Sequence, residues 1–211
     1  MQHILIHGLG QSSSSWDKTI SYMEKGDYVM CPDLSLFLKE MDVSYANLYK
    51  KFSEYCDNIS EPINLCGLSL GAVIALNYAI DNPEKVKSLV LIAPQYKMPK
   101  ALLNLQNMIF RIIPESKFKN MKIGKRGLIE LTSSMMNLDF SKSLKNIDCP
   151  VLVLCGEKDK ANKKAAYNIS ESIAKSKIQF IKHAGHEVNI DAPKELGEIL
   201  NQFYHGKHSS I

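Results

Sequence analysis

A serine stands between two glycines at residues 67–71, in the order Gly-Leu-Ser-Leu-Gly. An apolar run ending at Cys66 leads into this motif, and a run of helix-forming residues starting at Ala72 follows it. A strand, a tight turn and a helix in this order expose the serine hydroxyl above a sheet, and the tight turn requires small flanking residues. The N-terminus of the helix also favours negative charge that develops nearby. We therefore expect Ser69 to be a nucleophile; the competing interpretation is a glycine-containing turn with an incidental serine.

A serine hydroxyl is a poor nucleophile unless a base takes its proton, and the chain offers several late histidines for this role. His186 follows the last apolar run, within Ala-Gly-His-Glu, where a loop reaches the carboxyl edge of a parallel sheet. We expect His186 to be the base. His183 is the alternative, although a histidine at a strand end also fits a packed core position. His205 and His208 lie in a tail that we expect to fray.

The base needs an acid that fixes its tautomer and stabilises its charged form. Residues 156–159, Gly-Glu-Lys-Asp, directly follow the fifth apolar run. We expect Asp159 to be this acid, and Glu157, which is nearer to the strand, is its main rival. Asp33 ends the second run, but it precedes the serine in the chain, which is the wrong order for the arrangement.

Acyl transfer also requires hydrogen-bond donors for the developing oxyanion. Residues 7–10, His-Gly-Leu-Gly, follow the first apolar run, and their glycines permit a tight turn. We expect the backbone N–H groups of Leu9 and Leu70 to be the two donors, since Leu70 directly follows the nucleophile. His7 is expected to be structural and to steady the loop.

Six short apolar runs predict the strands that position these residues. They lie at residues 3–7, 28–31, 63–66, 86–93, 151–155 and 178–181. Helical patterns between them lie at residues 45–58, 72–81, 161–175 and 193–204. Continuous apolar strands that alternate with helices are typical of an α/β fold with a sheet buried on both faces. We therefore expect a mostly parallel sheet of about six strands, flanked by helices.

Residues 95–148 interrupt this alternation, because no strand is evident there. An apolar stripe from Leu102 to Ile113 predicts a helix ending at Pro114, and residues 127–136 predict a second helix. An insertion of this kind between two strands is a candidate lid. Residues 97–126 contain eight basic residues and one acidic residue. This segment is either a solvated lysine-rich surface or a site for anionic ligands, and a basic amphipathic helix can also lie on a membrane surface.

The 211 residues, of which 45% are hydrophobic and 23% charged, predict a single globular domain over residues 1–211. The net charge of +4 is modest, and no aromatic-rich motif accompanies the basic cluster, so no nucleic-acid partner is expected. The five cysteines lack metal-ligand spacing, so we expect reduced thiols, no metal and a cytoplasmic location. The start of the chain does not resemble a signal peptide, and no apolar run is long enough to predict a transmembrane segment.

The motifs at residues 7–10, 67–71 and 156–159, followed by Gly185-His186, resemble those of the α/β-hydrolase superfamily in type and order. The resemblance extends from His3 to Tyr204 and is greatest to small carboxylesterase-like and enol-lactonase-like members. It implies the α/β-hydrolase fold with a short helical lid at residues 95–148. The superfamily's usual opening β-hairpin is expected to be absent, because the chain begins at the strand that carries the oxyanion loop.

The resemblance also implies a serine hydrolase that cleaves a carboxylic ester or thioester through an acyl-enzyme, without a cofactor. Serine at position 69 argues against the haloalkane dehalogenases and epoxide hydrolases of the superfamily, which have aspartate there. The basic lid predicts a preference for anionic acyl substrates. Two alternatives stay open: a non-catalytic ligand-binding or signalling module on the same fold, and a C–C hydrolase or hydroxynitrile lyase.

Overall fold

The computed structural model describes residues 2–39, 41–118 and 122–206. Six strands form one sheet in the order β2-β1-β3-β4-β5-β6, and every neighbouring pair is parallel. The six strands are β1 (Gln2–Ile6), β2 (Tyr28–Met30), β3 (Ile63–Leu68), β4 (Val86–Ile92), β5 (Val151–Gly156) and β6 (Ser176–Ile181). The predicted α/β architecture is confirmed, and each apolar run forms the strand expected of it.

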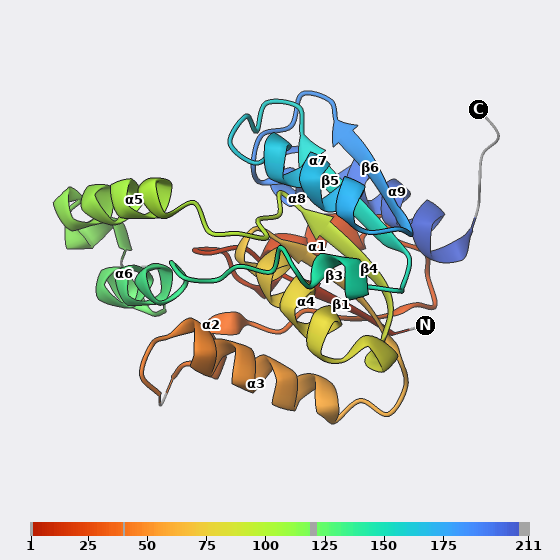
Figure 1. Ribbon diagram of the computed structural model, residues 1–211, viewed down its shortest axis with the longest axis horizontal. Coiled ribbons are helices and arrows are strands. Elements are labelled where there is room, and N and C mark those ends of the chain that lie inside the picture. The colour runs from red at the N-terminus through yellow and green to blue at the C-terminus, as the bar shows by residue number, and fades with distance from the viewer. Residues whose placement is uncertain (1, 40, 119–121, 207–211) are drawn as a thin grey trace.

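Helices cover both faces of this sheet (Figure 1). The α-helices are α1 (Asp17–Ile20), α2 (Leu34–Phe37), α3 (Tyr45–Asp57), α4 (Leu70–Asp81), α5 (Lys100–Ile112), α6 (Gly124–Ser134), α7 (Lys163–Ser172), α8 (Val188–Asp191) and α9 (Pro193–His205). Short 3₁₀ turns are η1 (Ser13–Trp16), η2 (Pro83–Lys85), η3 (Glu115–Phe118) and η4 (Leu144–Asn146). Within the described ranges, no helix combines the length and apolar composition needed to cross a membrane.

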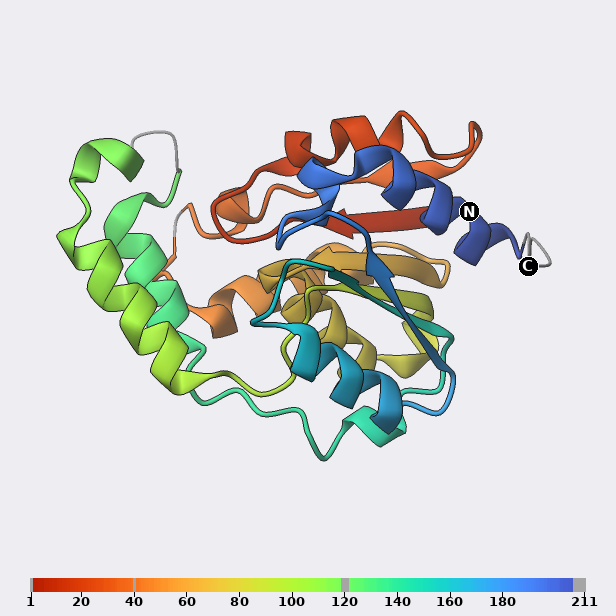
Figure 2. The same cartoon turned by 90° about the horizontal axis from the view of Figure 1, so that it is seen from above.

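The alternation of side chains along β1 shows how the sheet divides the core into two layers. Ile4 and Ile6 pack with α3, α4 and α7 on one face, whereas Leu5 packs with Trp16 and the apolar side of α9 on the other. Figure 2 shows these two helical layers with the sheet between them. Burial on both faces explains why the strands are continuous apolar runs rather than alternating ones.

Helices α5 and α6 form an arm that projects past the carboxyl ends of the strands (Figures 1 and 2). The arm lies between β4 and β5 in the chain, where the insertion was predicted. Helix α6 begins three residues earlier than expected, at Gly124, whose φ of +61° turns the chain into the helix. The assignment of residues 95–148 as a short helical lid stays a prediction.

Candidate active site

Ser69 lies in a strained turn between β3 and α4. Its φ of +54° is in the left-handed region that residues with side chains seldom adopt, and its N–H donates to the carbonyl of Ile92 at 2.9 Å. The two flanking glycines are sterically required: a Cβ on Gly67 would lie 2.2 Å from the carbonyl oxygen of Gly71, and one on Gly71 would lie 2.2 Å from that of Ile6. The turn therefore presents Ser69 at the carboxyl edge of the sheet, as its motif predicts.

His186 and Asp159 lie in the loops that follow β6 and β5, and they are hydrogen-bonded to each other. His186 Nδ1 donates to Asp159 Oδ2 at 2.8 Å. Burial raises the pKa of the Asp159 carboxyl, but hydrogen bonds from His186 and from Asn162 outweigh this effect and hold the pKa below its ordinary value. Asp159 is therefore a carboxylate near neutral pH. The geometry makes it an acceptor for Nδ1–H, which directs the Nε2 lone pair away from the carboxylate.

Asn162 is a site residue that the sequence analysis did not identify. It stands at the N-cap position of α7, but its side chain does not cap the helix. Its Nδ2 instead donates to both oxygens of Asp159, at 2.9 and 2.8 Å. Gln95 Nε2 donates in turn to Asn162 Oδ1 at 2.7 Å. The only sequence signal is an asparagine three residues after the acid, which is ordinary at a helix start.

The other candidates for acid and base do not form this pair. Glu157 is exposed, and its Oε2 accepts from the backbone N–H of His183 at 3.0 Å. The side chain of His183 is exposed, so the expectation of a packed core position is wrong. His205 is the last residue of α9 rather than part of an irregular tail, and its Nε2 lies 2.8 Å from Asp27 Oδ2. His208 lies outside the described residues.

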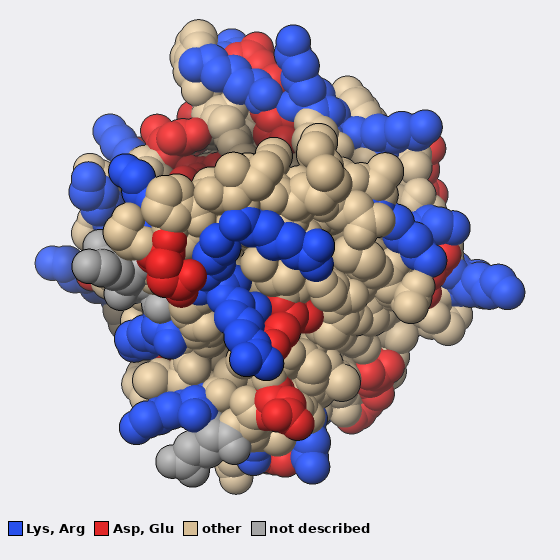
Figure 3. Space-filling view, turned by 90° about the vertical axis from the view of Figure 1, so that its left-hand side faces the viewer, with Lys and Arg blue, Asp and Glu red and all other residues tan. Residues whose placement is uncertain are grey.

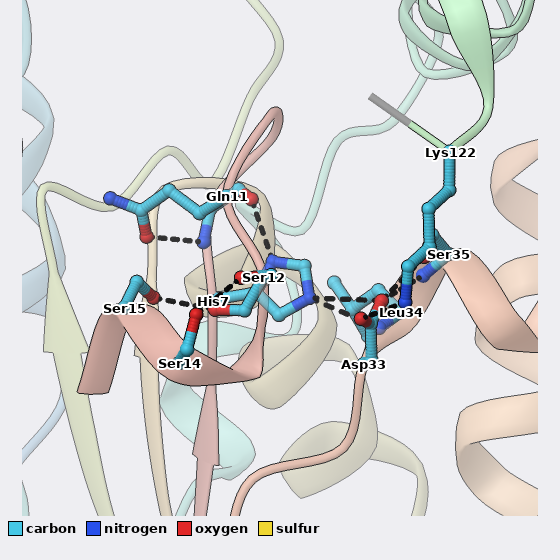
Figure 4. A network of polar contacts seen from close by, with 10 residues as sticks. His7, Gln11, Ser12, Ser14, Ser15, Asp33, Leu34, Ser35 and Lys122 are labelled. Atoms are coloured by element: carbon cyan, nitrogen blue, oxygen red, sulfur yellow. Dashed lines mark hydrogen bonds and ion pairs between the residues drawn. The ribbon is translucent and has the colours of Figure 1, made fainter. Parts of the chain in front are cut away.

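The loop after β1 is held by His7. His7 Nδ1 donates to the carbonyl of Gly8 at 2.9 Å, and its Nε2 accepts from the backbone N–H of Leu34 at 3.0 Å (Figure 4). Burial lowers the pKa of His7, which favours the neutral ring that these two contacts require. The structural role predicted for His7 agrees with these contacts. Leu9, one of the two predicted donors, therefore lies in a loop that is tied to the chain after β2.

Further polar contacts lie in this loop and in the chain after β2. Asp33, the N-cap residue of α2, lies 2.8 Å from Lys122 Nζ and also accepts from Ser35 (Figure 4). Gln11 Nε2 donates to Glu187 Oε1 at 2.8 Å, next to the candidate base. Asp33 thus caps α2 and pairs with Lys122, and none of its described interactions is with His186 or Ser69.

Ser69, His186 and Asp159 line one cavity of about 480 Å³, together with Leu9 and Leu70. Apolar side chains from the arm and from α4 form much of its wall: Val73, Met98, Leu102, Leu103, Phe110, Leu128 and Met135. No Lys or Arg is among the described residues that line it. A second cavity of about 400 Å³ shares Leu9 and Leu70 with the first, and its polar lining residues include Ser12, Asp33 and Lys122. Ser69, His186, Asp159, Leu9 and Leu70 therefore share one cavity whose wall is largely apolar.

Among the described residues, no group of three or more His, Cys, Asp or Glu side chains is arranged to hold a metal ion. Each of the five cysteines is unpaired. Cys155 is the cysteine that lies near Asp159. Burial raises the pKa of its thiol to about 12, so the thiol stays protonated near neutral pH. No cysteine is among the described residues that line the cavity with Ser69.

Comparisons with known proteins bear on the family and on the fold. The model of the alpha/beta hydrolase family matches residues 4–199. Monoacylglycerol lipase ABHD6 of Bos taurus is 21% identical over 263 residues, covering 98% of this chain and 76% of that protein. A thermophilic esterase from Thermogutta terrifontis has a TM-score of 0.81 at 19% identity and covers 99% of this chain and 91% of that one. The enol-lactonase from Burkholderia xenovorans LB400 has a TM-score of 0.82 at 15% identity, covering 97% and 91%.

Proposed function

Because this chain belongs to the alpha/beta hydrolase family, we propose that it is a serine hydrolase that cleaves a carboxylic ester or thioester. The observation that carries the proposal is the His186–Asp159 hydrogen bond of 2.8 Å beside Ser69 in one cavity. Family membership supports hydrolase chemistry, whereas the triad and the ester class are our inference from the geometry. No cofactor takes part in the proposed reaction.

The proposed reaction begins when His186 Nε2 takes the proton of Ser69 and the serine oxygen attacks the substrate carbonyl. Asp159 stabilises the imidazolium that forms, because its low pKa keeps it charged. The backbone N–H groups of Leu9 and Leu70 hold the oxyanion of the tetrahedral intermediate. His186 then donates its proton to the leaving alcohol or thiol. Water, activated by the same histidine, releases the acid from the acyl-enzyme and restores the serine.

The cavity wall supports an apolar acyl group as the substrate's acid part. Leu103 and Phe110 of α5 and Val73 of α4 contribute to that wall, and none of its described residues is a lysine or arginine. The basic segment instead predicted a preference for anionic acyl groups. The lysine that could support this preference is Lys122, which lines the second cavity and not this one. The ratio of kcat/KM for matched neutral and anionic acyl esters decides between the two substrate classes.

Labelling with a fluorophosphonate probe, read by intact mass, tests the nucleophile. We expect one adduct on the wild type, one on Ser12→Ala and none on Ser69→Ala, because Ser12 lines only the second cavity. Ser69→Ala should also lower ester hydrolysis by about ten-thousandfold. Equal labelling of Ser69→Ala would contradict the assignment. A folded wild type that is never labelled and never cleaves an ester would favour the non-catalytic module instead, and cleavage of carbon–carbon substrates alone would favour the C–C hydrolase.

The protein's location, which we propose to be cytoplasmic, is supported by its thiols. Five unpaired cysteines fit a reducing compartment, where disulfides are rare. Cell fractionation with an antibody to the protein checks this location directly.

A further inference from the structure

Helix α5 packs on α6 through a polar side chain. Asn107 is buried at this contact, where its Nδ2 donates to Ser133 Oγ at 3.1 Å and its Oδ1 accepts from Thr132 Oγ1 at 2.6 Å. Such buried hydrogen bonds are lost if the helix rotates about its axis, and an unsatisfied buried amide is costly. The Asn107 contacts therefore fix which side of α5 faces away from the protein.

The side that faces away is apolar. Five large side chains on it are between 47% and 81% exposed: Leu102, Leu105, Met108, Ile109 and Ile112. Their spacing of mainly three and four residues places them on one face of the helix. A surface helix normally buries its apolar face, whereas α5 exposes its apolar face to solvent. Figure 2 shows α5 as the outermost helix of the arm.

Positive charge lies beside this apolar face. Figure 3, which views this end of the molecule, shows Lys and Arg side chains across its middle, close to some Asp and Glu side chains and next to a broad uncharged area. Some cations here are paired, as Lys97 is with Asp139. Lys125 instead donates to the carbonyls of Arg111 and Ile113, at 2.7 and 2.8 Å. Within the described parts of the arm, the cations without an ion pair to a carboxylate are Lys100, Arg111, Lys117 and Lys125. Lys119 of the same segment lies outside the described residues.

We infer that the exposed face of α5 docks on an anionic lipid surface. An apolar strip with flanking cations is the arrangement that binds at the boundary between anionic headgroups and acyl chains. A second copy of this chain fits less well, because two such faces would bring their excess positive charge together. Leu102 both belongs to the exposed strip and lines the catalytic cavity, so docking would place the mouth of that cavity at the lipid. The inference goes beyond the proposed function, since binding does not depend on catalysis.

Vesicle flotation tests this inference with the full chain carrying Ser69→Ala, so that lipid hydrolysis cannot affect the result. The probes are vesicles of phosphatidylcholine alone and of phosphatidylcholine with about one third phosphatidylglycerol. We expect the protein to float with the anionic vesicles, at least about tenfold more than with the neutral ones, and to be released by high salt.

Two pairs of matched variants locate the contact. Leu105→Ser/Ile112→Ser removes two side chains of the exposed strip, and Tyr22→Ser/Tyr28→Ser removes two exposed apolar side chains elsewhere. Arg111→Glu/Lys117→Glu reverses two charges of the arm, and Lys164→Glu/Lys177→Glu reverses two exposed charges elsewhere. We expect each arm variant to lower binding at least about tenfold, and each control to bind as the Ser69→Ala parent does.

Three results would overturn the inference. The first is a parent protein that floats with neither kind of vesicle. The second is an equal loss of binding in the arm variants and the controls, which would place the contact elsewhere. The third is a concentration-dependent dimer in analytical ultracentrifugation that Leu105→Ser/Ile112→Ser abolishes, without vesicle binding; this would assign the face to a second copy. Because circular dichroism of each variant reports its folding, no loss of binding is confused with unfolding.

Discussion

At the scale of single residues, the Asp159 carboxylate depends on a neighbour that the motifs do not include. Asn162 donates to both of its oxygens, and His186 donates to one of them. The carboxylate is buried, so without these donors it would bind a proton more readily. Asn162 is therefore a positioning residue that acts through Asp159.

Replacing Asn162 tests this role. In Asn162→Ala, both hydrogen bonds to Asp159 are lost, so the pKa of Asp159 rises and the orientation of His186 is less well fixed. We expect kcat for an ester to fall about tenfold to hundredfold with KM nearly unchanged, and the acid limb of the pH profile to move to higher pH.

The control for this prediction is Asn168→Ala, on the same helix. Asn168 Nδ2 donates to the Tyr96 hydroxyl at 2.9 Å, away from Asp159. The control should leave the pH profile in place. A profile that shifts equally in both variants would show that Asn162 acts only through general stability.

At the scale of elements, the turn between β3 and α4 is possible only because backbone segments approach closely. The carbonyl of Gly71 occupies the space that a Cβ on Gly67 would need, and the carbonyl of Ile6 occupies the corresponding space at Gly71. These are contacts with backbone atoms, which cannot move aside as the end of a flexible side chain can. The packing of β3 against α4, which positions Ser69, therefore requires a hydrogen atom in place of a Cβ at both Gly67 and Gly71.

Gly67→Ala should therefore lower the free energy of unfolding by at least about 2 kcal/mol. Gly8→Ala is the matched control, because a Cβ there would lie 3.5 Å from the nearest atom, an ordinary contact distance. We expect a change below about 1 kcal/mol for the control. Urea unfolding followed by circular dichroism measures both values. Equal stability of the two variants would contradict the steric account.

At the scale of the whole molecule, buried histidines and paired carboxylates make folding dependent on pH. Burial lowers the pKa of His3 and of His7. For Asp27, Asp33 and Asp159, burial raises the pKa, but hydrogen bonds outweigh it and the net shift is downward. In all five groups the unfolded chain binds a proton at a higher pH than the folded chain does.

Stability should therefore fall as the pH falls, in two windows. The histidines act first, from about pH 6.5 downward, and the carboxylates act below about pH 4, because each window begins at the unfolded pKa. Each proton taken up on unfolding contributes a slope of at most about 1.4 kcal/mol per pH unit. Urea unfolding at a series of pH values measures the slope.

A matched pair of variants assigns the first window. His3→Gln should reduce the slope between pH 7 and pH 5, because the side chain of His3 is fully buried. His183→Gln should leave it unchanged, because that side chain is exposed. A constant free energy of unfolding from pH 7 to pH 5 in the wild type would contradict this account.

Much of the fold and the site was predictable because local sequence is sufficient to specify it. Continuous apolar runs predict buried parallel strands, and the six strands observed are those runs. The glycines around Ser69 predict a tight turn, since only glycine tolerates the close approach there. The carboxyl ends of parallel strands lie on one edge, so residues after successive strands were expected to meet.

Other features depend on distances between residues that are far apart in the chain, and only the tertiary structure decided them. The choice of Asp159 rather than Glu157 as the partner of His186 depends on how two loops turn after β5 and β6. The apolar stripe on α5 predicts a helix, but it does not predict whether the apolar face points toward the protein or away from it. Its apolar face points outward, and the buried Asn107 is hydrogen-bonded to α6, a pairing that exists only once both helices are packed.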